Sequence, residues 1–96
     1  MVEWVTREGY CPVCGYRTLP SHPHQVRYEI CPICYWEDDL VQQSKPKSPA
    51  GANKIPLQQA RENFRKYGAV ERRLVEYTRE PTDDDDRDPD WPYTER

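Results

Sequence analysis

The sequence has few of the residues from which a hydrophobic core is built. Of its 96 residues only 35% are hydrophobic, with a single phenylalanine and a single methionine, and the mean hydropathy is -1.11. Ten prolines also interrupt the chain. A domain this short and this polar cannot depend on apolar burial alone, so we expect another source of stability.

Long apolar runs are missing as well. No stretch approaches the roughly 20 apolar residues that cross a bilayer, and residues 1–6 lack a basic segment followed by an apolar one. We therefore expect a cytoplasmic protein without a membrane partner, in a reducing compartment where disulfides do not persist.

Recognisable catalytic sets are absent too. No serine or cysteine stands at a suggestive spacing from a histidine and a carboxylate. The His-x-Glu and Pro-Cys-x-x-Cys motifs of zinc deaminases are not found either. The sequence therefore predicts a protein that is not an enzyme.

The cysteines that are present form one pattern, C-x2-C-x16-C-x2-C, which is typical of a four-thiolate zinc site. Proline follows the first cysteine of each pair and fixes φ where the turn begins. The sequence therefore predicts one tetrahedral Zn²⁺ site with a structural role. Its ligands are Cys11, Cys14, Cys31 and Cys34.

Other metals and chemistries remain alternatives. A rubredoxin-like iron site has the same Cys-Pro-x-Cys motif and would make the protein an electron carrier. Four sulfurs suit iron as well as zinc, although we favour zinc. A thioredoxin-like redox motif would require a βαβ pattern that this chain is too short to contain. His22 and His24 are candidates for a second metal, but a solvated loop is the preferred interpretation.

The secondary structure expected around the cysteines is a zinc-ribbon-like β-hairpin. Val26, Tyr28 and Ile30 alternate with polar residues and lead directly into the second cysteine pair. Val2 and Trp4 also alternate with polar residues, as in a short strand or an apolar flap over the metal.

One or two helices are expected to follow and to cover this hairpin. Pro56 suits the first helical position and Gly68 the position just beyond the end. A second short helix is expected to end before Pro81. The apolar stripes are Leu57, Ala60, Phe64 and Tyr67 in the first, and Val70, Leu74 and Tyr77 in the second. The predicted fold class is a small metal-stapled α+β domain.

Charge is distributed unevenly along the chain. Residues 80–96 hold eight acidic and two basic residues, which predicts an acidic tail attached to a domain of residues 1–79. Four thiolates and one divalent cation together add -2, which takes the formal net charge from -3 to -5. Such a like-charge tail should not fold alone, so its tryptophan must dock on the domain or on a partner.

Acidic surface of this kind favours a non-catalytic interaction module for a basic protein partner. Helix-initial carboxylates are an alternative, preferred explanation for the acidic run after the second cysteine pair. Candidate partner-binding residues are Glu37, Asp38, Asp39, Asp83, Asp84, Asp85, Asp86 and Trp91.

Nucleic-acid binding is the second alternative, because zinc ribbons often bind nucleic acids. An acidic holoprotein disfavours it, since contacts to phosphate supply much of such affinity. The basic residues concerned are Arg61, Arg65, Lys66, Arg72 and Arg73.

The residues 30–39, Ile-Cys-Pro-Ile-Cys-Tyr-Trp-Glu-Asp-Asp, together with Gly-Ala-Asn at 51–53 and the helix at 57–64, resemble the bacterial cysteine-rich CPCC family. The resemblance runs from about Tyr10 to about Gly68. It differs at Val13, where the family has an additional cysteine, and this difference leaves a four-ligand site intact. The resemblance implies the fold and a bacterial origin. By association with neighbouring toxin genes it also implies an immunity partner.

Overall fold

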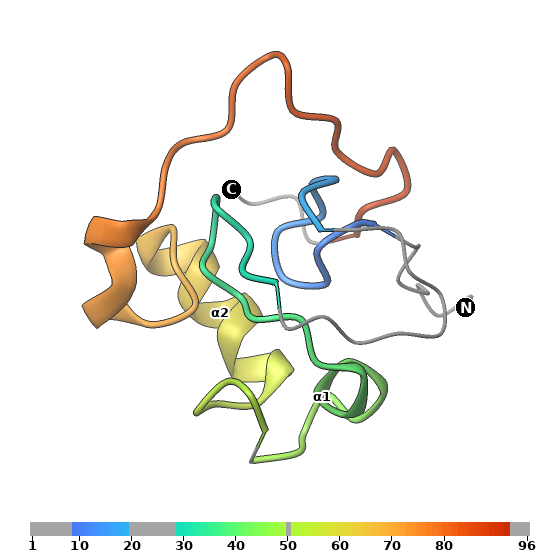
Figure 1. The fold of residues 1–96 in the computed structure, drawn as a ribbon, viewed down its shortest axis with the longest axis vertical. Coiled ribbons are helices and arrows are strands. Elements are labelled where there is room, and N and C mark those ends of the chain that lie inside the picture. The colour runs from blue at the N-terminus through green and yellow to red at the C-terminus, as the bar shows by residue number, and fades with distance from the viewer. Residues whose placement is uncertain (1–8, 20–28, 50, 93–96) are drawn as a thin grey trace.

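The computed structural model describes residues 9–19, 29–49 and 51–92 (Figure 1). Three helical elements occur in order, namely α1 (Leu40–Ser44), α2 (Leu57–Tyr67) and a 3₁₀ helix η1 (Arg72–Tyr77). In these residues the β-structure is confined to two isolated antiparallel bridges, Tyr16 with Arg87 and Ile30 with Glu37. Most of the expected hairpin, including Val26 and Tyr28, lies outside the described residues, as do Val2 and Trp4. The zinc-ribbon hairpin therefore stays a prediction.

The two cysteine knuckles, residues 11–16 and 31–36, share one backbone geometry. In the first, the N–H of Cys11 donates to Tyr16 O (2.8 Å) and that of Gly15 to Cys11 O (2.9 Å). In the second, Cys31 and Tyr35 repeat these bonds, both at 2.8 Å. The fifth residue of each knuckle is left-handed, with φ of 78° at Gly15 and 72° at Tyr35. This conformation costs a tyrosine roughly 1–2 kcal/mol. The second knuckle is therefore strained at Tyr35, whereas the first, with glycine at that position, is not.

Helix α2 lies within one residue of its predicted bounds. Pro56 is the N-cap, with extended backbone, and so stands just before the first helical residue. Gly68 ends the helix in the left-handed conformation, with its N–H on Phe64 O at 2.8 Å. Leu57, Ala60 and Phe64 are buried as predicted, whereas Tyr67 is 39% exposed, so the apolar stripe stops one turn early.

The second short helix is confirmed as η1, which ends well before Pro81. It buries only Leu74 and leaves Val75 and Tyr77 exposed. Before it, Val70 is 1% exposed and its N–H donates to Cys34 O at 2.9 Å. This bond ties the link between α2 and η1 to the second knuckle.

Helix α1 is capped by Asp39, which sequence reasoning offered both as a helix-initial charge and as a partner contact. One carboxylate oxygen of Asp39 accepts from Gln42 N (3.0 Å) and the other from Ala52 N (2.8 Å). Asp39 is 8% exposed, and a side chain at Gly51 would overlap it. The helix-capping interpretation is therefore the correct one for this residue.

A buried amide pair joins α1 to the loop before α2. Gln42 is fully buried, and its Nε2 donates to the carbonyls of Asn53 (3.2 Å) and Ile55 (3.0 Å). Its Oε1 accepts from the backbone N–H and from the Nδ2 of Asn53, both at 3.0 Å. Asn53 in turn exchanges hydrogen bonds with the backbone of Glu37, at 2.8 and 2.7 Å. These hydrogen bonds hold the loop before α2 against the segment that follows the second knuckle.

The acidic C-terminal segment returns to the first knuckle. Figure 1 shows it leaving η1 and curving towards the blue N-terminal knuckle. Asp88 N donates to Gly15 O (2.9 Å), and Arg17 N donates to Asp86 O (2.8 Å). Trp91 is 4% exposed, and a side chain at Gly15 would overlap its indole ring. The tail tryptophan therefore docks on the domain itself.

Replacing the buried glutamine tests the amide pair. We expect Gln42→Leu, which nearly conserves volume, to lower the free energy of unfolding by about 2–4 kcal/mol, because it leaves buried partners on Asn53 and Ile55 unpaired. The control is Gln43→Leu at the partly exposed neighbouring position. We expect this variant to change the free energy of unfolding by less than about 0.5 kcal/mol. Urea unfolding at a fixed excess of metal measures both. Equal stability of the two variants would contradict the assignment.

Candidate metal centre

The four cysteine side chains meet at one point. All four residues are fully buried, and their sulfurs lie within 4.8 Å of one another. The Sγ atoms of Cys11 and Cys34 are 3.5 Å apart, and those of Cys14 and Cys31 are 3.7 Å apart. A tetrahedron with metal–sulfur bonds of 2.3 Å has edges of ~3.8 Å. The cluster therefore has the size and ligand type of a four-thiolate metal site, and none of its cysteines is in a disulfide.

The closest sulfur pairs each join one knuckle to the other. Cys11 is the first cysteine of the first knuckle, and Cys34 is the second cysteine of the second knuckle. In the other pair, Cys14 is the second cysteine of the first knuckle and Cys31 is the first cysteine of the second. A cation at the centre would therefore bind the two knuckles together and not merely close each turn.

Burial sets the protonation of these thiols. It raises the pKa of Cys11 and Cys34. Burial also opposes ionisation of Cys31, but hydrogen bonds from the other three cysteines and from Thr18 lower the pKa of that thiol. Several thiols crowded together cannot all ionise without positive charge nearby, and a divalent cation supplies it.

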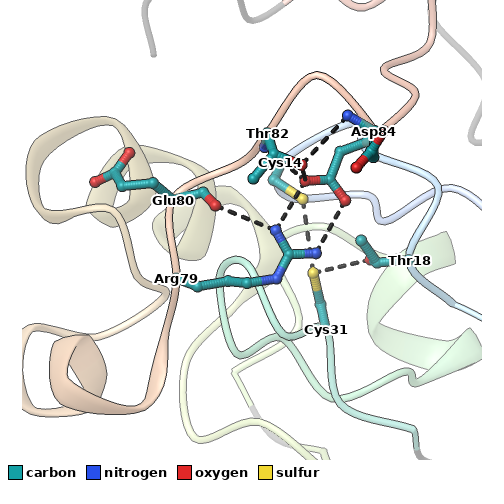
Figure 2. Close-up of polar contacts among 8 residues, drawn as sticks. Cys14, Thr18, Cys31, Arg79, Glu80, Thr82 and Asp84 are labelled. Carbon is teal, nitrogen blue, oxygen red and sulfur yellow. Dashed lines mark hydrogen bonds and ion pairs between the residues drawn. The ribbon is translucent and has the colours of Figure 1, made fainter.

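Two polar side chains approach the Cys14–Cys31 edge from outside (Figure 2). The hydroxyl of Thr18 donates to Cys31 Sγ at 2.9 Å. The guanidinium of Arg79 pairs with both carboxylate oxygens of Asp85, at 2.8 and 2.9 Å. Asp85 is the main cause of the raised pKa of Arg79, and negative charge on the sulfurs of Cys31 and Cys14 also contributes to it. One edge of the cluster thus has a hydrogen-bond donor and a positive charge beside it.

Apolar side chains fill the space around the cluster. Val13, Ile33 and Trp36 are at most 2% exposed and belong to the same core as the cysteines. Val13 thus serves as a packing residue beside the cluster. Tyr35 is partly exposed and packs against this core.

Helix α2 covers the first knuckle as well as contributing to the core. Arg61 Nε donates to Pro12 O at 2.8 Å. Leu57, Ala60 and Phe64 on the same helix pack in the core with the cysteines. The helix thus packs in one core with the cysteines, as predicted, whereas its packing on a hairpin stays a prediction.

The residues proposed for partner binding lie in different environments. Trp91 and Asp39 are buried, and Asp85 is paired with Arg79. Glu37 and Asp38 are partly buried beside the second knuckle. The exposed members are Asp83, Asp84 and Asp86. His22 and His24 lie outside the described residues.

The basic residues considered for nucleic-acid binding are mostly engaged within the protein. Arg65 and Lys66 lie 2.6 and 3.8 Å from Glu62, and Arg73 lies 3.0 Å from Glu71. Arg61 is held on the first knuckle by its bond to Pro12. Arg72 is exposed. These side chains do not form a free basic face.

Sequence reasoning missed Thr18 and Arg79 as neighbours of the cluster. Thr18 follows Cys14 at a spacing that is not part of the cysteine pattern, and Arg79 stands in a basic stretch where no residue is distinctive. No local signal marks either, because their position depends on how distant segments meet.

The fold and the cluster define a small domain whose four buried cysteines are suited to hold one metal ion. A family model described as cysteine-rich CPCC matches residues 9–85, and the chain belongs to this family. The match extends beyond Gly68 through η1 and into the acidic segment. A search of curated proteins gave no match. Among the described residues, no helix has the length and apolar character to span a membrane.

Metal stoichiometry tests the cluster directly. We expect one Zn²⁺ or Co²⁺ per chain, with the cobalt protein showing the spectrum of a tetrahedral thiolate site. Cys14→Ser should lose that spectrum and most of the helical circular dichroism, because binding energy is folding energy in a domain this small. A chelator that removes the ion while the melting curve stays unchanged would contradict a structural role.

Thr18 and Arg79, which lie beside the Cys14–Cys31 edge, should strengthen zinc binding. Because each stabilises thiolate charge, we expect Thr18→Val and Arg79→Gln to weaken zinc binding about 10-fold in a competition titration. The control is Arg72→Gln, which removes an exposed charge from η1 and should have no effect. Equal affinities for Arg79→Gln and Arg72→Gln would show that the charge of Arg79 does not stabilise the thiolates.

Proposed function

We propose that this protein is a non-catalytic interaction module whose fold is stabilised by one Zn²⁺ on Cys11, Cys14, Cys31 and Cys34. The observation that supports it best is the enclosed cluster: all four cysteines are buried and their sulfurs lie within 4.8 Å of one another, so all four can be ligands of one ion. A catalytic zinc keeps a position open for water or substrate, and four protein ligands leave none. Zinc is preferred to iron because closed four-cysteine sites in small domains are usually structural zinc sites.

The partner we propose is a basic protein. Exposed carboxylates at Asp83, Asp84 and Asp86 support it, since they project from a segment that Trp91 and Asp88 hold on the domain. An ordered acidic surface attracts a basic partner without the entropy cost of ordering a free tail. The specific form of the proposal is an immunity or inhibitor role against a basic toxin, an association that comes only with the family resemblance.

Binding to nucleic acid is less well supported. The arginines and lysine that would contact phosphate are mostly paired with Glu62, Glu71 or the first knuckle, and the formal net charge is -3 before any metal is counted. Non-specific affinity for nucleic acid depends on unpaired positive charge.

The test is binding of the purified zinc-loaded protein to the purified product of the adjacent gene, by calorimetry at two salt concentrations. We expect affinity to fall with salt and to fall at least about 10-fold when Asp83, Asp84 and Asp86 are all changed to Asn. The matched control changes the same three residues to Glu, which preserves the charge and should preserve the affinity. Absence of a complex would refute the immunity role, and an unaltered affinity for the Asn variant would refute its electrostatic basis.

A further inference from the structure

Residues 85–91, which we name the strap, lie along the first cysteine knuckle (Figure 1). Three hydrogen bonds join the strap to the end of this knuckle, from Cys14 onward. The bonded atoms are Arg17 N with Asp86 O (2.8 Å), Arg87 Nε with Cys14 O (3.1 Å) and Asp88 N with Gly15 O (2.9 Å).

We propose that opening of the strap controls the release of the metal ion, and that Cys14 is the cysteine that this opening frees first. The proposal rests on the zinc site of the proposed function and goes beyond it, because it concerns exchange of the ion and not the partner. It implies that the two knuckles open separately, although their backbone geometry is the same.

Side chains hold the strap at both ends. At its start, both carboxylate oxygens of Asp85 accept hydrogen bonds from Arg79, at 2.8 and 2.9 Å. At its end, Trp91 is 4% exposed and packs so closely on Gly15 that a side chain there would overlap the indole ring. The guanidinium carbon of Arg87 lies 5.9 Å from the centroid of that ring. The closed strap is therefore one specific conformation.

Little else supports the closed strap. Of residues 80–92, only Asp88 and Trp91 are buried, and none belongs to a helix. Arg87 Nη2 is buried and finds no hydrogen-bond partner among the described residues, which lowers the stability of the closed strap. Segments with few buried groups open locally, at a lower free energy than the whole domain unfolds. We therefore expect the strap to open while the rest of the protein stays folded.

The first half of the same knuckle has a separate anchor. Arg61 Nε, on α2, donates to Pro12 O at 2.8 Å, and Val13 is 2% exposed in the core. These contacts hold the chain beside Cys11 when the strap is open. Within this knuckle, Cys14 is therefore the cysteine whose carbonyl the strap holds.

The second knuckle is anchored without the strap. Val70 N donates to Cys34 O at 2.9 Å, and Arg79 N donates to Pro32 O at 3.2 Å. Ile33, between the two cysteines of this knuckle, is 1% exposed in the core. Opening of the strap therefore leaves both of these cysteines in place.

The position of Cys14 in the cluster gives strap opening an effect on the ion. Its Sγ lies 3.7 Å from that of Cys31, on the edge of the cluster that Arg79 approaches from outside (Figure 2). Four protein ligands leave no position open for an incoming ligand. Once the strap opens, Cys14 can withdraw, and a thiolate or a chelator can take its place. The strap thereby sets the rate of exchange.

Amide hydrogen exchange of the zinc-loaded protein, followed by NMR, tests whether the knuckles open separately. The N–H groups of Arg17 and Asp88 bond across the strap, whereas those of Tyr35 and Val70 bond to the second knuckle. We expect the first two to have protection factors at least about 10-fold lower than the other two, and equal to each other because one motion exposes both. Similar protection at all four amides would overturn the proposal.

Removing the last anchor of the strap tests its effect on the ion. We expect Trp91→Ala to speed transfer of Zn²⁺ to an excess of chelator at least about 10-fold. N-ethylmaleimide labelling, mapped by mass spectrometry, should reach Cys14 before the other three cysteines, whereas a general loss of stability would expose all four alike. The matched control is Tyr67→Ala, which removes a partly exposed aromatic ring from α2, outside the strap, and should change neither result.

A second variant keeps the test decisive should Trp91→Ala not fold. Arg87→Met removes the hydrogen bond to Cys14 O while keeping an unbranched side chain, and it should also speed transfer. Transfer rates equal to that of Tyr67→Ala, or equal labelling of all four cysteines, would overturn the proposal. Zinc content is measured first: a protein that binds no zinc would refute the zinc site itself, whereas a zinc-loaded protein with uniform opening would remove only the strap.

Discussion

The close approach of four buried thiol sulfurs is the constraint on which the rest of the structure depends. They lie within 4.8 Å of one another in a domain with little apolar material. Sulfurs at this spacing are repulsive once ionised and are stabilised by a central cation. The knuckle turns, with their shared hydrogen bonds and left-handed fifth residue, present the sulfurs in the geometry that such an ion requires.

The backbone carbonyls of the knuckles organise the remainder of the chain. Five of them accept a hydrogen bond from a segment distant in sequence. These bonds attach α2, the link to η1, and residues 79, 87 and 88 to the cysteine turns. The donor and acceptor pairs are Arg61 with Pro12, Arg87 with Cys14, Asp88 with Gly15, Val70 with Cys34 and Arg79 with Pro32. Directional bonds to a rigid centre thereby supplement a small hydrophobic core.

The acidic segment combines two roles because of this arrangement. Its last part covers the first knuckle, where Arg87 also lies over the ring of Tyr16, with 4.8 Å between the guanidinium carbon and the ring centroid. Its middle part, held by the Arg79–Asp85 pair, exposes the carboxylates of Asp83, Asp84 and Asp86. Folding of the tail thus buries Trp91, the aromatic residue that sequence reasoning offered as a partner anchor.

The sequence by itself determined the features that obey local rules. Cysteine spacing identified the cluster, and Pro56 and Gly68 bounded α2 to within one residue. The pattern of Val70, Leu74 and Tyr77 predicted a second short helix, although Val70 lies before η1 and Tyr77 is exposed. Turns, caps and helical periodicity depend on near neighbours. Only the tertiary structure decided the burial of Gln42, the docking of Trp91 and the position of Arg79 beside the sulfurs. Each of these depends on which segments far apart in the chain meet, and a local pattern does not contain that information.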